Sequence, residues 1–301
     1  MQSPHIPVLF DEVLEEFKDI KNGYLLDCTL GYGGHSIGLL KKNSNIKLIA
    51  NDQDEEALKF SKEYLKDYKS RIIFNQGNFE HIIKKFKDYD VKGILADIGV
   101  SSLQLDKKER GFSFKSETLD MRMDGSQKKD AALVLNEYPK EKLEKILSEF
   151  GEIREAKKVT NLLCENRPFQ SAKQLADFLA KNLRKTKKIH SATLVFQALR
   201  IEVNDELGVL KRLLESIEKQ NFKDCKLVLI SFHSLEDRIV KNYFKKWSKA
   251  CICPKEAMKC TCGKNHKLGR IISKKPILAK DDELKQNPRS RSAKMRVFYF
   301  E

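Results

Sequence analysis

Short apolar runs alternate with amphipathic stretches over the first third of the chain. Apolar runs near 23–28, 46–51, 71–75 and 92–98 have the length of buried strands, and the stretches between them have helical spacing. Strands that alternate with helices predict a parallel sheet covered by helices on both faces. The sequence therefore predicts an α/β fold for this part of the chain.

The alternation stops after residue 104. Residues 105–128 are polar with interspersed aromatics, and residues 130–220 have helical spacing with no strand candidate. Apolar residues spaced three and four apart indicate the buried face of one helix: Leu207, Leu210, Leu214 and Ile217. A strand pattern then returns at Lys226, and a helix follows from about Leu235 to Trp247.

This order predicts a helical domain inserted into an α/β domain whose sheet resumes afterwards. The expected boundaries place the first part of the α/β domain at 1–107, the inserted helical substrate-binding domain at 108–205, and the second part at 206–301. The second part contains a cysteine-rich loop and a basic C-terminal segment.

The first strand ends in Asp27 and runs into three glycines, Gly31, Gly33 and Gly34. Glycine permits a positive φ and lets a ligand lie against bare backbone N–H groups. Asp52 ends the next strand, where a βαβ unit places a carboxylate on a cofactor ribose. A dinucleotide fingerprint would need a third glycine where Ser36 stands, so the loop favours S-adenosylmethionine over NAD.

Two later strands also end in polar residues, at the edge where open α/β sheets bind ligands. Asp97 ends one strand and is placed to face a reacting centre, although a helix cap is the alternative interpretation. The segment S-F-H-S-L-E-D-R, residues 231–238, follows the other strand. Ser234 with Asp237 could form a capping box there, and Phe232 could stack on a base.

Gln197, Arg200 and Asn204 form a polar stripe on one predicted helix. Such a stripe is either a solvated face or a binding surface, and the absence of lysine from it favours binding in this lysine-rich chain. Basic runs at 181–188 and 288–296, the second with Arg289 and Arg291, suit phosphate contacts.

The overall charge is strongly positive. Lysine and arginine outnumber aspartate and glutamate by 58 to 43, giving a formal charge of +15 and a pI near 9.3. This excess favours a polyanionic partner such as nucleic acid, with a general lysine bias as the alternative. The first residues do not resemble a secretory leader, and no apolar run approaches the ~20 residues of a membrane span. We therefore expect a soluble, cytoplasmic protein without a membrane partner.

The seven cysteines do not indicate a disulfide framework in a chain of this length. Four of them form the pattern C-x-C-x6-C-x-C: Cys251, Cys253, Cys260 and Cys262. Four thiolates could hold a structural zinc ion, although C-x-C is tighter than the usual zinc spacing. The alternative is a loop of reduced thiols.

Eight motifs occur in order along the chain: H-x-P-V-L from His5, D-x-T-x-G-x-G-G-H-S, D-I-G-V-S-S, R-G-F-S-F, L-D-M-R-M-D, F-Q-A-L-R-I-x-V-N, S-F-H-S-L-E-D-R and N-P-R-S-R-S. Together they resemble the bacterial 16S rRNA cytosine-N4 methyltransferase family (RsmH/MraW). The resemblance implies a class I (Rossmann-like) S-adenosylmethionine-dependent methyltransferase with an inserted all-helical domain. Its implied substrate is N4 of a cytidine in the decoding region of 16S rRNA, in the small ribosomal subunit. Asn51 departs from the family, in which a small apolar residue usually precedes the ribose acid.

The resemblance also implies which residues contact the cofactor: Gly33, Gly34, His35, Asp52, Phe79, Asp97 and Gln104. An exocyclic cytosine amine is a poor nucleophile, so an acceptor must take hydrogen bonds from its N–H groups as the new bond forms. Asp97, with Ser101 or a backbone carbonyl, is the candidate acceptor, and His233 is the candidate for the proton lost afterwards. The cytidine must be unstacked to reach such a site.

The predicted RNA contacts combine the stripe, the segment at residues 231–238 and the C-terminal run: Gln197, Arg200, Asn204, Ser231, Phe232, Ser234, Arg238, Arg289 and Arg291. In this hypothesis the helical insertion grips structured RNA while the 231–238 segment receives the flipped cytidine. Two other functions compete with it: a nicotinamide-dependent oxidoreductase, and a non-catalytic RNA-binding assembly factor that keeps the cofactor fold.

Overall fold

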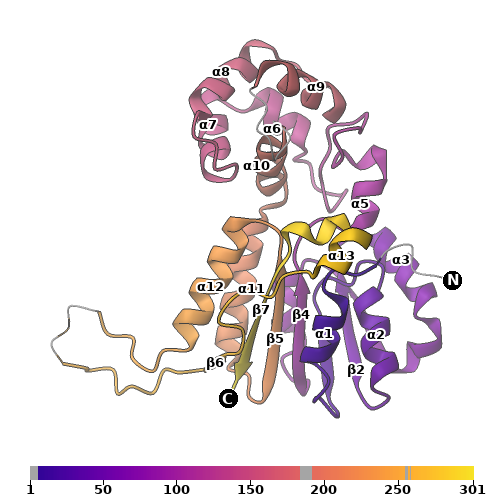
Figure 1. The fold of residues 1–301 in the computed structure, drawn as a ribbon, viewed down its shortest axis with the longest axis vertical. Helices are drawn as coiled ribbons and strands as arrows, with labels where there is room; N and C mark the ends of the chain where they lie inside the picture. Colours follow the sequence, from indigo (N-terminus) through magenta and orange to yellow (C-terminus); the bar gives the residue numbers. More distant parts are fainter. Residues whose placement is uncertain (1–5, 184–191, 255–256, 258) are drawn as a thin grey trace. The chain divides into compact units, whose positions relative to one another are not determined.

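The computed structural model describes residues 6–183, 192–254, 257 and 259–301 (Figure 1). The chain divides into two compact units, Met1–Gly99 with Val209–Glu301, and Val100–Gly208. The first unit contains the sheet and the second is helical.

The first unit is built on one seven-stranded sheet with the order β3-β2-β1-β4-β5-β7-β6. Strands β1 to β5 pair in parallel, and β7 is antiparallel to both of its neighbours. The strands are β1 (Tyr24–Asp27), β2 (Lys47–Asp52), β3 (Ile72–Gln76), β4 (Val91–Asp97), β5 (Cys225–Ser231), β6 (Gly269–Ile271) and β7 (Lys294–Phe300). The strand order reverses between β1 and β4, and ligands of open α/β sheets bind beyond the carboxyl ends of the strands at such a switch point.

Helices cover both faces of this sheet (Figure 1). They are α1 (Phe10–Glu16), α2 (Gly34–Lys42), α3 (Glu55–Tyr64), α4 (Ile82–Lys85), α11 (Glu206–Gln220), α12 (Ser234–Trp247) and α13 (Asp281–Gln286), with short 3-10 turns η1 (Lys66–Arg71), η2 (Phe79–His81) and η4 (Pro288–Ser292). Successive strand residues such as Leu25 and Leu26 point to opposite faces, and each belongs to a separate buried cluster. Burial on both faces explains the continuous apolar runs of the sequence. The predicted α/β class I arrangement is confirmed.

The two C-terminal strands were not predicted. β7 pairs with β5 over the whole of K-M-R-V-F-Y-F, and β6 is a three-residue strand on its other side. The prediction for Leu210, Leu214 and Ile217 is confirmed, because all three are buried on α11, and Leu213 joins them.

The second unit has no strand among its described residues. Its helices are α5 (Ser102–Asp106), α6 (Ala131–Glu137), α7 (Lys140–Glu149), α8 (Ala156–Glu165), α9 (Ala172–Asn182) and α10 (Thr193–Asn204), with the 3-10 turn η3 (Lys108–Arg110). Helix α10 packs against α6 and α7 and buries Val195, Ala198 and Leu199 in the core of this unit. In neither unit does a described helix have the length and apolar character of a membrane span.

Candidate active site

The glycine loop (residues 27–36) joins β1 to α2 at the switch point of the sheet. Gly31 and Gly33 have φ of 51° and 73°, a left-handed backbone that favours glycine. A Cβ built on Gly31 would have no atom of the described residues within 4 Å, whereas a Cβ on Gly34 would come within 2.4 Å of the Pro7 side chain. Gly31 therefore leaves room for a ligand beside bare backbone, while Gly34 is needed for packing.

The buried Asp27 carboxylate accepts two hydrogen bonds from other residues of the glycine loop. Its Oδ2 accepts a hydrogen bond from the Ser36 hydroxyl at 2.7 Å, and its Oδ1 accepts one from the Thr29 N–H at 3.1 Å. Burial raises the pKa of Asp27 to about 6 despite these hydrogen bonds. Ser36, which stands where a dinucleotide loop would have glycine, is thus a partner of a buried carboxylate.

Asp52 lies opposite the same loop at the end of β2. Its Oδ2 accepts the Gly31 N–H at 2.8 Å and its Oδ1 accepts the Asp54 N–H at 2.9 Å. Burial, the largest effect, raises the pKa of Asp52 to about 6. Each oxygen keeps a second lone pair, so the carboxylate can accept further hydrogen bonds from a ligand.

Asn51, the residue that departs from the family pattern, is buried, and both the amide nitrogen and the oxygen of its side chain make hydrogen bonds. Its amide donates to the carbonyls of Cys28 and Gly77, both at 3.0 Å, and its Oδ1 accepts from Asn75 at 2.6 Å. These bonds join the ends of β1, β2 and β3. The polar residue therefore fixes the loops around Asp52, a role that the sequence did not reveal.

Asp97 ends β4 beside the glycine loop. Its N–H donates to the Thr29 hydroxyl at 2.7 Å, but its buried Oδ1 has no hydrogen-bond partner among the described residues. Burial raises the pKa of Asp97 to about 7, with smaller contributions from the charges of Asp27 and Glu236. A buried, unsatisfied carboxylate oxygen is costly in a resting protein and is a common feature of functional sites.

We call Asp27, Asp52 and Asp97 the strand-end acids. Burial is the largest cause of all three upward shifts in pKa, and no lysine or arginine of the described residues is among their main causes. The carboxyl edge of the sheet therefore has one buried acid, Asp27, and two partly buried acids, Asp52 and Asp97, with no cation of the described residues paired with them. This arrangement favours a ligand that brings positive charge.

The S-F-H-S segment after β5 forms the start of α12. His233 is the N-cap: its Nδ1 accepts from the Glu236 N–H at 3.5 Å, and Glu236 Oε2 accepts the His233 N–H at 3.3 Å. The capping box therefore uses His233 and Glu236 instead of Ser234 and Asp237. His233 Nε2 lies 3.1 Å from Glu236 Oε1, so the predicted proton acceptor already faces a buried carboxylate.

Phe232 and Ser231 lie on either side of the β5 terminus. A Cβ built on Gly99 would approach the Phe232 ring to 3.0 Å, so this partly buried ring lies against the backbone that follows Asp97. Ser231 is buried, and its hydroxyl donates to the Lys294 carbonyl at 3.4 Å. The Phe232 ring therefore puts an aromatic surface close to the strand-end acids. The Ser231 hydroxyl, in contrast, makes a hydrogen bond within the sheet.

The N-terminal motif packs on the glycine loop. His35 is buried, and its Nε2 lies 2.9 Å from the Val8 carbonyl oxygen. The Leu9 N–H donates to Glu283 Oε1 at 2.8 Å, which ties the motif to α13. His35 thus anchors the segment that borders the loop. His5, the first residue of the motif, lies outside the described residues.

The other predicted cofactor residues lie in different units. Phe79, in the first unit, begins η2 and is partly buried against the sheet cluster. Ser101 and Gln104, in the second unit, bond to each other: the Ser101 N–H donates to Gln104 Oε1 at 3.0 Å, and the Gln104 N–H lies 3.3 Å from the Ser101 hydroxyl. That pair caps α5, so both residues have a structural role.

The polar stripe on α10 makes bonds within the second unit. Gln197 donates to the Phe150 carbonyl at 2.8 Å. Arg200 forms a two-bond ion pair with the buried Glu206, at 2.8 and 2.9 Å. Asn204 binds both sides of the 121–123 backbone, accepting the Met123 N–H and donating to the Met121 carbonyl, each at 2.8 Å. The stripe is therefore not a solvated face, because each of its three side chains has a hydrogen-bond partner within the second unit.

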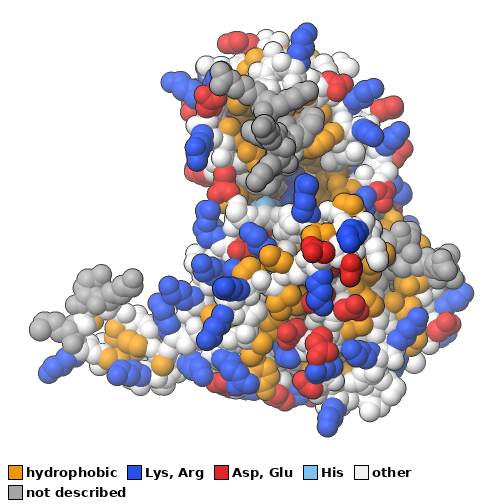
Figure 2. Space-filling view, viewed as in Figure 1, with side chains coloured by type: hydrophobic (Ala, Val, Ile, Leu, Met, Phe, Trp, Pro, Cys, Tyr) orange, Lys and Arg blue, Asp and Glu red, His pale blue; other side chains and the backbone are white. Residues whose placement is uncertain are grey.

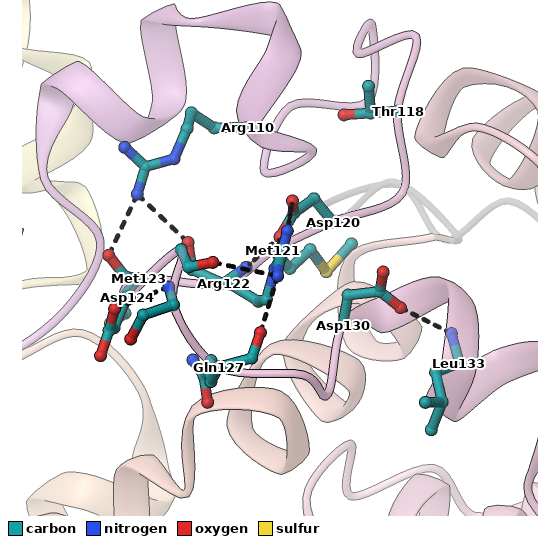
Figure 3. A network of polar contacts seen from close by, with 12 residues as sticks. Arg110, Thr118, Asp120, Met121, Arg122, Met123, Asp124, Gln127, Asp130 and Leu133 are labelled. Carbon is teal, nitrogen blue, oxygen red and sulfur yellow. Dashed lines mark hydrogen bonds and ion pairs between the residues drawn. The ribbon is translucent and has the colours of Figure 1, made fainter.

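The arginine loop (residues 110–130) contains the R-G-F-S-F and L-D-M-R-M-D motifs. Figure 3 shows Arg110 donating to the carbonyls of Arg122 and Met123, at 3.2 and 3.1 Å. Arg122 binds both oxygens of Asp120 at 2.7 Å. Gly111 has φ of 76°, and a Cβ there would come within 2.4 Å of the Asp120 nitrogen. The two motifs are thus the two sides of one internally bonded loop.

The remaining predicted RNA contacts are on the surface of the first unit. Ser234, Arg238, Arg289 and Arg291 are all exposed. Arg296, at the end of the second basic run, is different: it lies buried in β7 and pairs with Asp237 at 2.6 and 3.1 Å. The sequence predicted that the whole basic run 288–296 contacts phosphate, and this prediction is wrong for Arg296.

In the other basic run, 181–188, residues 184–188 lie outside the described part of the chain.

Known proteins match this chain over its entire length. The MraW methylase family matches residues 2–301. The ribosomal RNA small subunit methyltransferase H of Aliarcobacter butzleri is 64% identical over 301 residues and covers 100% of both chains. The protein of the same name from Sulfurimonas denitrificans is 57% identical, over 98% of this chain and 97% of the relative. That from Nitratiruptor is 56% identical, over 100% and 99%. This chain therefore belongs to the MraW methylase family, as the eight sequence motifs predicted.

Proposed function

We propose that this protein transfers a methyl group from S-adenosylmethionine to N4 of a cytidine in the decoding region of 16S rRNA, in the small ribosomal subunit. The observation that supports this cofactor is the set of strand-end acids, which are buried or partly buried at the switch point and have no balancing cation among the described residues. S-adenosylmethionine carries positive charge on its sulfonium and its amino group. NAD would instead bring the negative charges of a pyrophosphate to three carboxylates.

The rRNA substrate has different support. The Aliarcobacter, Sulfurimonas and Nitratiruptor relatives are small-subunit rRNA methyltransferases by name and match from end to end, at up to 64% identity. A formal charge of +15 suits an RNA partner. Neither point identifies the nucleotide, which comes from the resemblance of the motifs.

We assign cofactor contacts to residues around the glycine loop. Asp52 would accept hydrogen bonds from the two ribose hydroxyls through its remaining lone pairs. The open space at Gly31 would take the ligand against bare backbone. Phe79 would flank the adenine. We assign Gly33, Gly34 and His35 to the support of this loop, and Gln104 stays a predicted contact.

Asp97 is the proposed acceptor in the methyl transfer. Bound S-adenosylmethionine supplies an electrophilic methyl group on sulfur. Asp97 Oδ1, which has no partner in the part of the chain that the structure describes, would accept a hydrogen bond from the N4 amine and hold the nitrogen lone pair toward that methyl. Its pKa of about 7 lets the same carboxylate take the proton that the amine loses. Phe232 would stack on the flipped base, and His233 becomes a secondary candidate because it caps α12 with Glu236.

The decisive experiment is Asp97→Asn, which keeps the shape of the side chain but removes its charge. Single-turnover methyl transfer to small subunits that lack the modification should fall by about 100- to 1,000-fold at saturating cofactor. Asp90→Asn is the matched control, because Asp90 precedes β4 at the opposite end and is largely exposed beside Lys92. A rate within tenfold of wild type would exclude Asp97 as the acceptor.

The two competing functions predict different results in simple assays. Calorimetric titration should show S-adenosylmethionine binding and no NAD binding, and binding of NAD alone would overturn the proposal. A non-catalytic assembly factor would bind the cofactor and the small subunit but transfer no methyl group. Mass mapping of the modified nucleosides would locate the cytidine.

A further inference from the structure

The cysteine segment (residues 248–268) connects α12 to β6 and makes no secondary structure of its own in its described residues (Figure 1). It is closed at its base: the Leu268 N–H donates to the Trp247 carbonyl at 2.9 Å, and the His266 N–H donates to the Ala250 carbonyl at 3.1 Å. Beyond that base the segment has no apolar core, since its described residues are exposed or partly exposed and Ile252 is 57% exposed. Something other than hydrophobic burial must therefore hold its shape.

Four cysteine sulfurs converge in this segment. All four Sγ atoms, from Cys251, Cys253, Cys260 and Cys262, lie within 4.8 Å of one another. Three of them form a triangle with sides of 3.6 Å, between Cys251, Cys260 and Cys262. A disulfide would require a separation of about 2.05 Å, so the four cysteines are free thiols. Four sulfurs bound to zinc at about 2.3 Å would lie about 3.8 Å apart at the corners of a tetrahedron.

The backbone around the sulfurs also suits a metal site. In an extended chain, side chains two residues apart point to the same side, so each C-x-C pair presents both thiols together. The Thr261 N–H donates to Cys253 Sγ at 3.4 Å, and the Ile252 N–H donates to Cys262 Sγ at 3.5 Å. Such bonds stabilise thiolates, which are the metal-binding form of cysteine.

We propose that Cys251, Cys253, Cys260 and Cys262 bind one zinc ion in a closed structural site. Four thiolate ligands complete a tetrahedral shell and leave no position for water or substrate, so this site has no part in methyl transfer. The ion supplies the cross-link that the segment lacks. The proposal does not depend on the rRNA substrate or on the cofactor.

The test measures metal in the full-length protein. Protein purified without chelator from zinc-supplemented cells should contain about one zinc per chain by elemental analysis, and the Cys260→Ser/Cys262→Ser variant about one tenth of that or less. Cys164→Ser is the matched control, because Cys164 is a partly buried thiol on α8, remote in sequence, and should keep the full zinc content. The double variant should still unfold cooperatively, since the described residues of the segment add nothing to the hydrophobic clusters of the sheet apart from Leu268 at its base.

A second measurement uses only the wild-type chain. After removal of zinc with a chelator, titration with cobalt(II) should produce thiolate-to-cobalt charge-transfer absorption that saturates at one equivalent. All four thiols should also react slowly with a thiol reagent in the zinc form and quickly in the stripped form. A protein that contains no zinc, gives no charge-transfer band and has four freely reactive thiols would overturn the proposal. The recovery of two disulfides from freshly lysed cells would overturn it as well.

Discussion

The glycine loop with its strand-end acids and the arginine loop are both polar, glycine-containing and rich in charge, but they balance their charges differently. In the arginine loop, burial alone would raise the pKa of Asp120, yet the hydrogen bonds and charge of Arg122 lower it below its usual value. Burial raises the pKa of each strand-end acid to about 6 or 7, and no basic group of the described residues is among the main causes that oppose it. Charges that are paired inside the protein maintain its structure, whereas charges left unpaired at a strand edge are available for a ligand.

Among the strand-end acids, we expect the largest effect on cofactor binding at Asp52. Asp52→Ala should weaken S-adenosylmethionine binding by about 100-fold, because it removes an acceptor of charge-assisted hydrogen bonds worth ~1.5–3 kcal/mol each. The melting temperature of the ligand-free protein should change little by comparison. Titration calorimetry and thermal melts on the same samples measure both quantities. An unchanged affinity would remove Asp52 from the cofactor site.

Asp97→Asn and Asp120→Asn make the same chemical change in the two loops and should alter stability in opposite directions. Asp120→Asn breaks the two-bond pair with Arg122, which is about one-quarter exposed, so unfolding should cost about 1–2 kcal/mol less. Asp97→Asn removes a charge whose burial is unfavourable, so the ligand-free melting temperature at pH 8 should stay equal or rise. Thermal melts at pH 8 test both variants, and a large loss of stability in Asp97→Asn would contradict the difference between the two loops.

The amino-acid sequence predicted the parallel part of the sheet because strands buried on both faces leave long apolar runs. It did not predict β7, since K-M-R-V-F-Y-F carries basic residues at its start and resembles a phosphate-binding run. The partner that neutralises Arg296 is Asp237, on another element and distant in sequence. An ion pair between residues that are distant in sequence depends on tertiary structure, so the local sequence pattern does not predict it.

The same limit applies to the candidate site. Strand-end positions indicated Asp52 and Asp97 because the carboxyl edge of a parallel sheet is defined by local pattern. The stripe on α10 was predicted to bind RNA, but Gln197 and Asn204 make bonds to backbone groups far away in the sequence. Asn51 and the packing of Pro7 on Gly34 were missed for the same reason. An RNA contact from Arg200 stays a prediction, although its guanidinium is paired with Glu206.

The pH dependence of cofactor binding tests whether the strand-end acids act through their charge. Their folded pKa values are raised, so their contribution to the stability of the ligand-free protein is present below about pH 4 and is lost as pH rises through 6 to 7. A cationic ligand favours the ionised acids, so S-adenosylmethionine affinity should increase roughly tenfold between pH 5.5 and 7.5. Calorimetry in two buffers of different ionisation enthalpy should detect proton release on binding. Asp52→Ala should release fewer protons, and a flat pH profile in wild type would show that the acids are not titrating.

The smallest expected effect concerns the surface that meets RNA. Figure 2 shows many Lys and Arg side chains over the part of the first unit next to the cysteine segment. The described residues 248–254 and 259–268 contain exposed lysines and no acidic residue, among them Lys249 and Lys259. If these lysines bind phosphate, replacing both by alanine should weaken small-subunit binding several-fold. The slope of log K against log salt should flatten by roughly 0.7–0.9 for each phosphate that is no longer neutralised.

Matched substitutions decide which basic surface grips the RNA. Lys84, on α4, and Lys87, just after that helix, are exposed lysines of the sheet unit outside the predicted RNA contacts. Their double alanine variant removes the same charge and should leave the salt slope unchanged. The inserted helical domain was predicted to be the electrostatic grip through Lys185, Lys187 and Lys188, which lie outside the described residues. Their triple alanine variant should then flatten the slope by roughly three times the value for one phosphate.

If neither that variant nor the Lys249→Ala/Lys259→Ala variant changes the salt slope, both lysine surfaces are excluded as the RNA-binding surface. The exposed arginines of the η4 turn, Arg289 and Arg291, would become the better candidates, because guanidinium groups bind phosphate with two hydrogen bonds.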